Sequence, residues 1–267
     1  MSRPPRAPRS VMAVASVAVA FLALPLVGLL QRAPWTGLGR LLGERDVLDA
    51  LRVSLTVSVV AAVVVLLLGT PLAWALARAD LNLGRLPVRR LVRTLVLLPM
   101  VLPPVVGGTA LLFALGRRGL VGLWLERWFN LTLPFTTTGA VVAASFVALP
   151  FYVVTVEGAL HTMGDDHEQM AATLGAGPVA VLRRVTLPRL LPAMGAGLAL
   201  AWARALGEFG ATITFAGNLP GRTRTLPLAT FQALESDPQA ALALSLLLLA
   251  VSLAVLVPTR DRWLPTR

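Results

Sequence analysis

Long apolar segments separated by short polar stretches run along almost the whole chain. They lie at residues 11–30, 53–77, 92–115, 138–160, 190–215 and 238–258. Each is close to the roughly 20 residues that a helix needs to cross a bilayer. No long polar region, internal repeat or low-complexity linker separates them. The pattern therefore predicts an all-α, polytopic membrane protein with six transmembrane helices, forming a single domain over residues 1–267.

The first apolar segment follows Arg3, Arg6 and Arg9, and this gives it a superficial likeness to a signal peptide. Its apolar run is about 20 residues, whereas that of a typical signal peptide is roughly 7–15 residues. The residues that follow, 31–34, offer no clear cleavage site of small residues. We interpret the segment as a retained first span.

The composition agrees with a membrane protein. Hydrophobic residues make up 56% of the chain and charged residues 14%, whereas ordinary globular proteins carry about 25% charged residues. The net charge is +11, and every basic residue is an arginine. Because these arginines lie between apolar segments and form no single basic face, they indicate loop orientation rather than nucleic-acid binding.

Six spans would place both termini on the same side of the membrane. That side, which includes residues 161–189, carries more arginines than the opposite side. By the positive-inside rule, both termini and this loop are predicted to be cytoplasmic.

Two residue types are missing, and each absence excludes a class of chemistry. A nucleotide-binding P-loop needs a lysine, and the chain has none. If ATP drives the function, another subunit hydrolyses it. The lack of cysteine excludes disulfides and thiolate catalysis. The two histidines, His161 and His167, flank the polar loop without a carboxylate-rich geometry, so the sequence predicts neither a metal site nor a catalytic site.

The polar stretch at 165–192, DDHEQMAATLGAGPVAVLRRVTLPRLLP, has the features of a helix-turn-helix. Gly175 and Gly177 supply a flexible break, and Pro178 suits the first turn of a second helix. A structured insert of this kind in a membrane protein predicts a docking element. We refer to residues 165–188 as the coupling loop.

The coupling loop resembles the EAA loop of ABC importer permeases, whose general form is E-A-A-x3-G-x9-I-x-L-P. Aligned on Gly175, the spacing to Leu187 and Pro188 fits without a gap. The E-A-A positions fall on residues 169–171, of which only Ala171 matches, and Glu168 lies one residue early.

The fifth apolar segment contains two charged residues, Arg204 and Glu208. Four residues apart on a helix, they would share one face and could pair, which lowers the cost of charges at membrane depth. One interpretation is a structural ion pair that fixes helix packing, and the other places Arg204 near a route for anions. Gly207 and Gly210 would let a neighbouring backbone approach closely.

Two further motifs point to the same family. Residues 204–229, RALGEFGATITFAGNLPGRTRTLPLA, are strongly similar to the molybdate-type permeases among the ABC importers, and sulfate-type permeases share mainly the first seven positions. Residues 97–119, LLPMVLPPVVGGTALLFALGRRG, resemble the same family. Here Pro103 and Pro104 are expected to kink or unwind the helix. The resemblance covers roughly residues 50–258.

The resemblance implies the type I ABC importer permease architecture in a bacterial cytoplasmic membrane. It implies a homodimer with one pathway, two ABC ATPase subunits that bind ATP and Mg²⁺, and an extracytoplasmic oxyanion-binding protein. The chain itself would bind no cofactor. The expected ATPase-coupling residues are Glu168, Gln169, Ala171, Ala172, Gly175, Leu187 and Pro188. The expected pathway or gate residues are Arg204, Glu208, Pro103, Pro104, Asn218 and Thr223.

The transported anion is predicted to be molybdate, with tungstate next and sulfate or thiosulfate as the alternative. A stand-alone secondary anion transporter is a second class, and it would be expected to show internal repeats and carboxylates within spans. The only clear carboxylate within a span is Glu208, which is already matched in sequence with Arg204.

Overall fold

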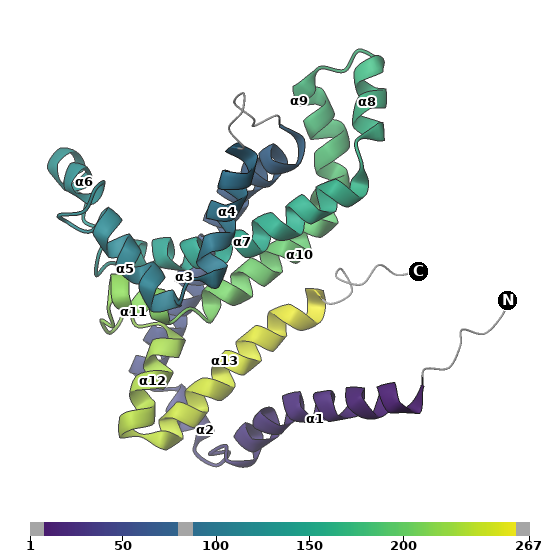
Figure 1. The fold of residues 1–267 in the computed structure, drawn as a ribbon. Helices are drawn as coiled ribbons and strands as arrows, with labels where there is room; N and C mark the ends of the chain where they lie inside the picture. Colours follow the sequence, from purple (N-terminus) through teal and green to yellow (C-terminus); the bar gives the residue numbers. More distant parts are fainter. Residues whose placement is uncertain (1–7, 80–87, 260–267) are drawn as a thin grey trace.

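The computed structural model describes residues 8–79 and 88–259, and every regular element in these ranges is a helix (Figure 1). The elements of the first half are α1 (Arg9–Gln31), α2 (Leu38–Leu42), α3 (Arg45–Arg78), α4 (Val88–Val101), α5 (Pro104–Leu115) and α6 (Gly122–Phe129). Those of the second half are α7 (Thr137–Met163), α8 (Asp166–Thr173), α9 (Pro178–Val181), the π-helical segment η1 (Leu182–Thr186), α10 (Leu187–Leu206), α11 (Gly210–Ala216), α12 (Leu226–Ser236) and α13 (Pro238–Thr259).

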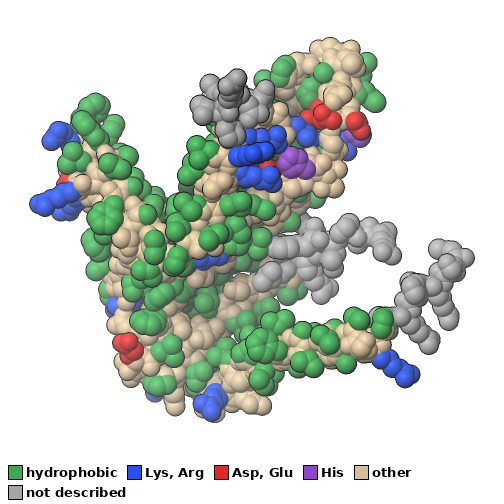
Figure 2. Space-filling model, in the orientation of Figure 1, with side chains coloured by type: hydrophobic (Ala, Val, Ile, Leu, Met, Phe, Trp, Pro, Cys, Tyr) green, Lys and Arg blue, Asp and Glu red, His purple; other side chains and the backbone are tan. Residues whose placement is uncertain are grey.

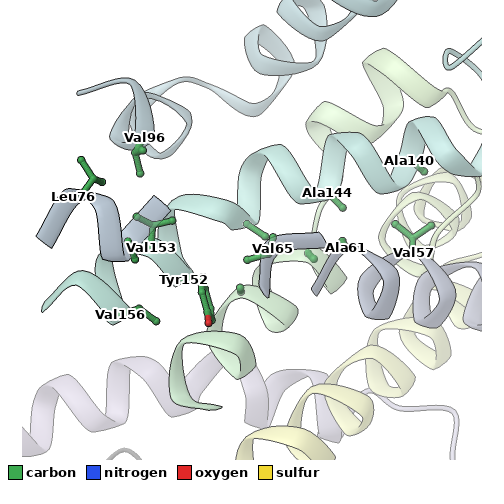
Figure 3. Packing of buried hydrophobic residues seen from close by; sticks show 14 of the residues in the cluster. Val57, Ala61, Val65, Leu76, Val96, Ala140, Ala144, Tyr152, Val153 and Val156 are labelled. Atoms are coloured by element: carbon green, nitrogen blue, oxygen red, sulfur yellow. The ribbon is translucent and has the colours of Figure 1, made fainter. Parts of the chain in front are cut away.

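The core lies where α3, α7 and α10 pack against one another. Its buried residues are mostly alanine and valine, among them Ala61, Ala144 and Val153 (Figure 3). Helices in a membrane gain little from burying apolar surface against each other, so small residues that allow close contact hold them together. The alanine-rich faces of these segments therefore explain why these three helices form the centre.

One aromatic side chain fills the space between the three central helices. Tyr152 on α7 is fully buried, and its hydroxyl lies 2.7 Å from the Thr70 hydroxyl of α3. A Cβ atom placed on Gly69 would lie 2.6 Å from the tyrosine ring, and one on Gly197 of α10 would lie 3.3 Å from it. The two glycines thus make room for the ring, and the hydrogen bond satisfies its buried hydroxyl.

Four of the predicted spans are each contained in one helix. Segments 11–30, 53–77, 138–160 and 238–258 fall within α1, α3, α7 and α13, respectively. By length and apolar character, five helices of the described chain are able to cross a membrane, the fifth being the continuous run Pro178–Leu206. Apolar side chains are exposed along α1 and over much of the molecular surface (Figure 2), as expected for a protein surrounded by lipid.

The other two predicted spans are interrupted. The break in segment 92–115 was predicted, whereas the prediction of a continuous helix was wrong for segment 190–215. Segment 92–115 divides into α4 and α5 at Leu102 and Pro103, because proline lacks an N–H and disfavours a helical conformation in the residue before it. The predicted break at the prolines is thereby confirmed. Segment 190–215 divides into α10 and α11, with α10 ending at the Gly207 cap. The third predicted span thus corresponds to the two short helices α4 and α5 in tandem.

Candidate functional site

The coupling loop forms a helix-turn-helix that projects from one end of the helix bundle (Figure 1). Helices α8 and α9 are its two arms, and Pro178 is the first residue of α9, as predicted. Gly175, in the turn, has a φ of +86°, a conformation that glycine adopts at little cost. The second arm continues through η1 directly into α10. The loop and the long helix behind it are therefore a single continuous helical path.

The tip of the coupling loop is exposed and largely uncharged. Leu174 at the turn is 84% exposed, and Met170 and Val179 are also mostly exposed. No other atom lies within 4 Å of a Cβ placed on Gly175. Figure 2 shows that the acidic side chains of the loop lie toward its base rather than at this tip. An exposed group of apolar and small side chains is typical of a surface that another protein covers.

The expected coupling residues differ in how accessible they are. Gln169, Ala172, Gly175 and Pro188 are exposed, whereas Ala171 and Leu187 are half-buried. The Gln169 amide donates a hydrogen bond to the Asp165 carboxylate within α8 at 2.8 Å. The exposed members surround the turn and the outer side of the loop, where a partner could reach them.

Glu168 is turned toward the helix bundle. Its Oε2 accepts a hydrogen bond from Arg78 Nε at 3.0 Å, and its Oε1 accepts one from the Thr186 hydroxyl at 2.8 Å. Arg78 is the last residue of α3, and its Nη2 also donates to the carbonyl oxygens of Leu160 and Gly164 at the end of α7. We call Arg78, Glu168 and Thr186 the clamp.

The clamp joins α3, α7, α8 and η1 through charged hydrogen bonds, which are stronger than neutral ones. Sequence reasoning missed Arg78 and Thr186, and it treated Arg78 only as an orientation signal. The position of an arginine at the end of an apolar helix was the available signal. Nothing in the sequence, however, indicates that a glutamate 90 positions later is its partner.

A second region of interest lies where the two interrupted spans meet. A Cβ placed on Gly108 of α5 would lie 2.7 Å from Thr214 Cβ and 2.8 Å from the Ala211 carbonyl oxygen, both on α11. A Cβ on Gly210 would lie 2.8 Å from Pro104 Cβ. Only glycine permits this approach, so α5 and α11 are in backbone contact directly after their respective breaks. We call this region the paired break.

At the paired break, Glu208 interacts in two ways while remaining almost fully buried, at 2% exposure. Its Oε1 accepts a hydrogen bond from the Ala211 N–H at 2.8 Å, which caps the start of α11. Its Oε2 lies 2.6 Å from Arg204 Nη1, so the predicted ion pair is confirmed. The two residues do not, however, lie on one helix, because α10 ends at Leu206.

The Arg204 side chain is 27% exposed, whereas that of its partner is buried. The guanidinium group therefore reaches the surface of this chain while the carboxylate holds it from inside. Pro103 and Pro104 begin α5 on the other side of the paired break. The structure thus brings Pro104 close to the segment that carries Glu208, and Glu208 links Arg204 to the same region. The sequence analysis had assigned these residues to the pathway from separate motifs.

Asn218 and Thr223 lie beyond α11, in a compact loop. The Asn218 side chain accepts a hydrogen bond from Arg224 Nε at 3.0 Å and donates one to Gln232 at 3.1 Å. Thr223 is fully buried, and its hydroxyl accepts a hydrogen bond from the Leu219 N–H at 2.9 Å. Asn218 is therefore half-exposed on the loop, whereas Thr223 supports the loop from within.

Comparison with known families identifies the family to which the chain belongs. Residues 69–264 match the family described as binding-protein-dependent transport system inner membrane component. The chain belongs to this family. It is therefore a membrane-spanning transport permease of the inner membrane, as the motifs had predicted.

Individual relatives of the chain are also transport system permease proteins. The chain is 48% identical to the molybdenum transport system permease protein ModB of Mycobacterium tuberculosis, with 96% of this chain and 95% of the relative covered. It is 40% identical to ModB of Escherichia coli K12, covering 81% and 92% of the two chains. It is 37% identical to the sulfate transport system permease protein CysT of Salmonella typhimurium, covering 88% and 84%.

Solved structures confirm the fold. A bacterial ABC transporter that imports the acidic polysaccharide alginate superposes with a TM-score of 0.71 at 18% identity, over 96% of both chains. The MetNI methionine ABC transporter in an inward-facing conformation superposes with a TM-score of 0.59 at 18% identity, over 84% of this chain and 95% of that one. The predicted type I ABC importer permease fold is confirmed.

Proposed function

We propose that the chain is the membrane-spanning subunit of an ATP-driven importer for molybdate. The observation that carries this proposal is the 48% identity to a molybdenum transport permease over 96% of the chain. Identity to the sulfate permease is lower, at 37%, and this supports sulfate as the second candidate. Tungstate is a tetrahedral dianion like molybdate, and we expect it to follow the same route.

We propose that two copies of the chain form one pathway and bind two ATPase subunits and an extracytoplasmic oxyanion-binding protein. The family description includes dependence on a binding protein. A related fold, with a TM-score of 0.72 at 16% identity, belongs to an alginate transporter in complex with a periplasmic protein. Because the chain has no lysine for a P-loop, ATP and Mg²⁺ would be bound by the ATPase. Both termini and the coupling loop would face the cytoplasm.

We propose that the coupling loop docks into the ATPase through its exposed side. Gln169, Ala172 and Gly175 would form the contact, with Leu174 as an apolar anchor. Glu168 would act indirectly, since its carboxylate is already bonded within the clamp. The half-buried Ala171 and Leu187 would shape the loop, and Pro188 would mark where it enters α10.

The clamp would transmit the motion of the ATPase subunits to the helix bundle. When the ATPase subunits close on ATP, they would move the two coupling loops together. Because Arg78 ties the loop to α3 and α7, and η1 joins it to α10, the three core helices would follow as a unit. Rigid-body motion of packed helices of this kind is a common way to switch between two states.

The paired break would form the narrow part of the pathway. A passing oxyanion needs a positive group that attracts it without holding it tightly. Arg204 offers a partly exposed guanidinium, and Glu208 beside it offsets much of its charge. Pro103 and Pro104 would let α5 tilt relative to α4, with Asn218 beyond α11 on the adjoining loop and Thr223 supporting that loop.

Transport in vesicles tests the proposal. The chain, its ATPase and its binding protein are reconstituted in proteoliposomes. Uptake of molybdenum, tungsten and sulfur is then measured by elemental mass spectrometry. We expect ATP-dependent uptake of molybdate that tungstate competes with strongly and sulfate weakly. Uptake of sulfate in preference to molybdate would assign the chain to the second candidate. Uptake by the chain alone without ATP would replace the importer with a secondary transporter.

A further inference from the structure

Helix α6 projects from the tip of α5, apart from the helix bundle (Figure 1). It is held in a defined position. The Val121 N–H donates to the Ala114 carbonyl at 2.8 Å, so the turn between α5 and α6 is closed. At the other end, Asn130 adopts a left-handed conformation with a φ of 50° and caps the helix through its N–H. The position of α6 is therefore fixed by backbone hydrogen bonds at both of its ends.

The two sides of α6 differ in where their apolar side chains point. Leu125 packs inward against the apolar cluster around Leu111 and Leu133. On the outer side, Trp124 and Trp128 are four residues apart on one helix face, and Leu120 lies in the turn that precedes α6. Leu120 is 83% exposed and Trp128 is 71% exposed. The two tryptophan rings contact each other edge to face, with centroids 5.9 Å apart.

Arginines surround this apolar stripe. Arg127 lies over the Trp124 ring, 5.9 Å from its centre, and Arg117 pairs with Glu126 at 3.9 Å. Arg118 is also exposed, which leaves the projection with a net positive charge. Figure 2 shows these blue side chains next to green apolar ones on the projection. Exposed tryptophans bordered by arginines match the chemistry of a bilayer surface, where apolar chains meet anionic headgroups.

The position of α6 along the membrane axis agrees with this chemistry. It lies between the end of α5 and the start of α7, and the coupling loop follows the other end of α7. The 27 residues of α7 make it about 40 Å long at 1.5 Å per residue, compared with a hydrocarbon core of about 30 Å. The two ends of α7 thus lie near opposite membrane surfaces. Helix α6 is at the surface away from the coupling loop.

We propose that α6 is an interfacial anchor: its outer face lies in the headgroup region opposite the coupling loop and binds anionic phospholipids through Arg118 and Arg127. The positive charge of these side chains is complementary to such headgroups. This inference requires only that the chain spans the membrane, which the family establishes, and it does not depend on the transported anion. The anchor would fix the outer end of α5 while the inner ends of the spans move.

The absence of cysteine makes a direct test available. Leu120→Cys and Phe129→Cys place single nitroxide labels at exposed positions at the two ends of α6 and keep both tryptophans. Leu67→Cys on an exposed apolar face of α3, and Ser236→Cys on the exposed end of α12, are the membrane and water controls. The complex is reconstituted in vesicles of phosphatidylethanolamine and phosphatidylglycerol. The measured quantity is the ratio of label collisions with oxygen to collisions with a water-soluble nickel chelate.

We expect ratios at positions 120 and 129 that are several-fold above the value at 236 and below the value at 67. Readings equal to that at 236 would overturn the proposal. Immobilisation of such water-exposed labels by added extracytoplasmic binding protein would identify the face as a protein contact instead.

A second comparison tests the role of charge. With phosphatidylcholine in place of phosphatidylglycerol, the ratios at 120 and 129 should fall toward that of Ser236→Cys. Adding Arg118→Gln and Arg127→Gln should produce the same fall in the original vesicles. Ratios that respond to neither change would overturn the binding of anionic headgroups.

Discussion

Two arginine–glutamate pairs occupy the two proposed functional regions of this permease, and they are built in opposite ways. Arg204 and Glu208 are four residues apart, and the carboxylate is buried at the paired break. Arg78 and Glu168 are 90 residues apart and lie at the partly exposed base of the coupling loop. The first pair acts locally, because it caps the short helix α11. The second joins helices that are distant in sequence.

The packing around the two pairs also differs: it is close around the first pair and open around the second. At the paired break, glycines bring α5 and α11 into backbone contact, and little space is left to adjust. In the coupling loop, Gly175 and Gly177 face open space. The paired break therefore contributes packing stability, whereas the coupling loop contributes an exposed surface and a connection between helices. Four substitutions should separate these roles, in order of their expected effect on the free energy of unfolding.

The largest loss is expected for Glu208→Gln. The change leaves Arg204 without its carboxylate and weakens the cap of α11. Removing one partner of a buried ion pair typically costs about 3–5 kcal/mol. A lower midpoint of thermal unfolding in detergent, together with loss of uptake, is the expected result. Glu235→Gln, at an exposed position of α12, is the control and should leave both unchanged. An unaltered Glu208→Gln protein would contradict the structural role of the pair.

Gly108→Ala should follow, with a loss of about 1–3 kcal/mol, the usual range for an overpacked core. The added methyl group would overlap Thr214 and the backbone of Ala211. Gly28→Ala in α1, where a Cβ meets nothing within 4 Å, is the matched control. Thermal unfolding of the two purified variants should separate them clearly. Equal midpoints would mean that α5 and α11 are not tightly packed.

Arg78→Gln should lower stability by about 1.5 kcal/mol, the lower end of the range for charged hydrogen bonds, because the site is partly exposed. It should reduce transport more than stability. The loop would lose the hydrogen bonds by which Arg78 joins it to α3 and to the end of α7, while its exposed surface stays intact. We expect more ATP hydrolysed per molybdate imported. Combining Arg78→Gln with Glu168→Gln should add less than the sum of the single effects, since both remove the same bond. Fully additive effects would argue against the clamp.

The smallest effect on unfolding, about 1 kcal/mol from placing a side chain at a positive φ, is expected for Gly175→Trp, although it should abolish binding of the ATPase. The substitution adds bulk at the exposed turn, where the backbone has a positive φ. Gly175→Ala carries the same backbone strain with little bulk, so it should keep the ATPase bound. Co-purification of the ATPase in mild detergent measures the difference. If both variants retain the ATPase and transport normally, the coupling assignment is wrong.

The part of the site that was predictable depended on local spacing. The i, i+4 spacing of Arg204 and Glu208 anticipated their pairing, and Pro178 anticipated the start of α9. The apolar segments anticipated α1, α3, α7 and α13. The interruption after Leu206 was not anticipated, because an apolar run does not reveal that Gly207 will end α10 and that Glu208 will cap the start of a new helix.

By itself, the sequence determined the membrane class, the helix-turn-helix of the coupling loop and the family. Each of these follows from apolar length, turn residues or a contiguous motif, and all of them are local properties of the chain. Only the tertiary structure decided that Arg78 holds Glu168, that Thr223 is buried, and that the two breaks lie side by side. These contacts join residues far apart in sequence, and they form only when glycines and alanines let the helices pack closely.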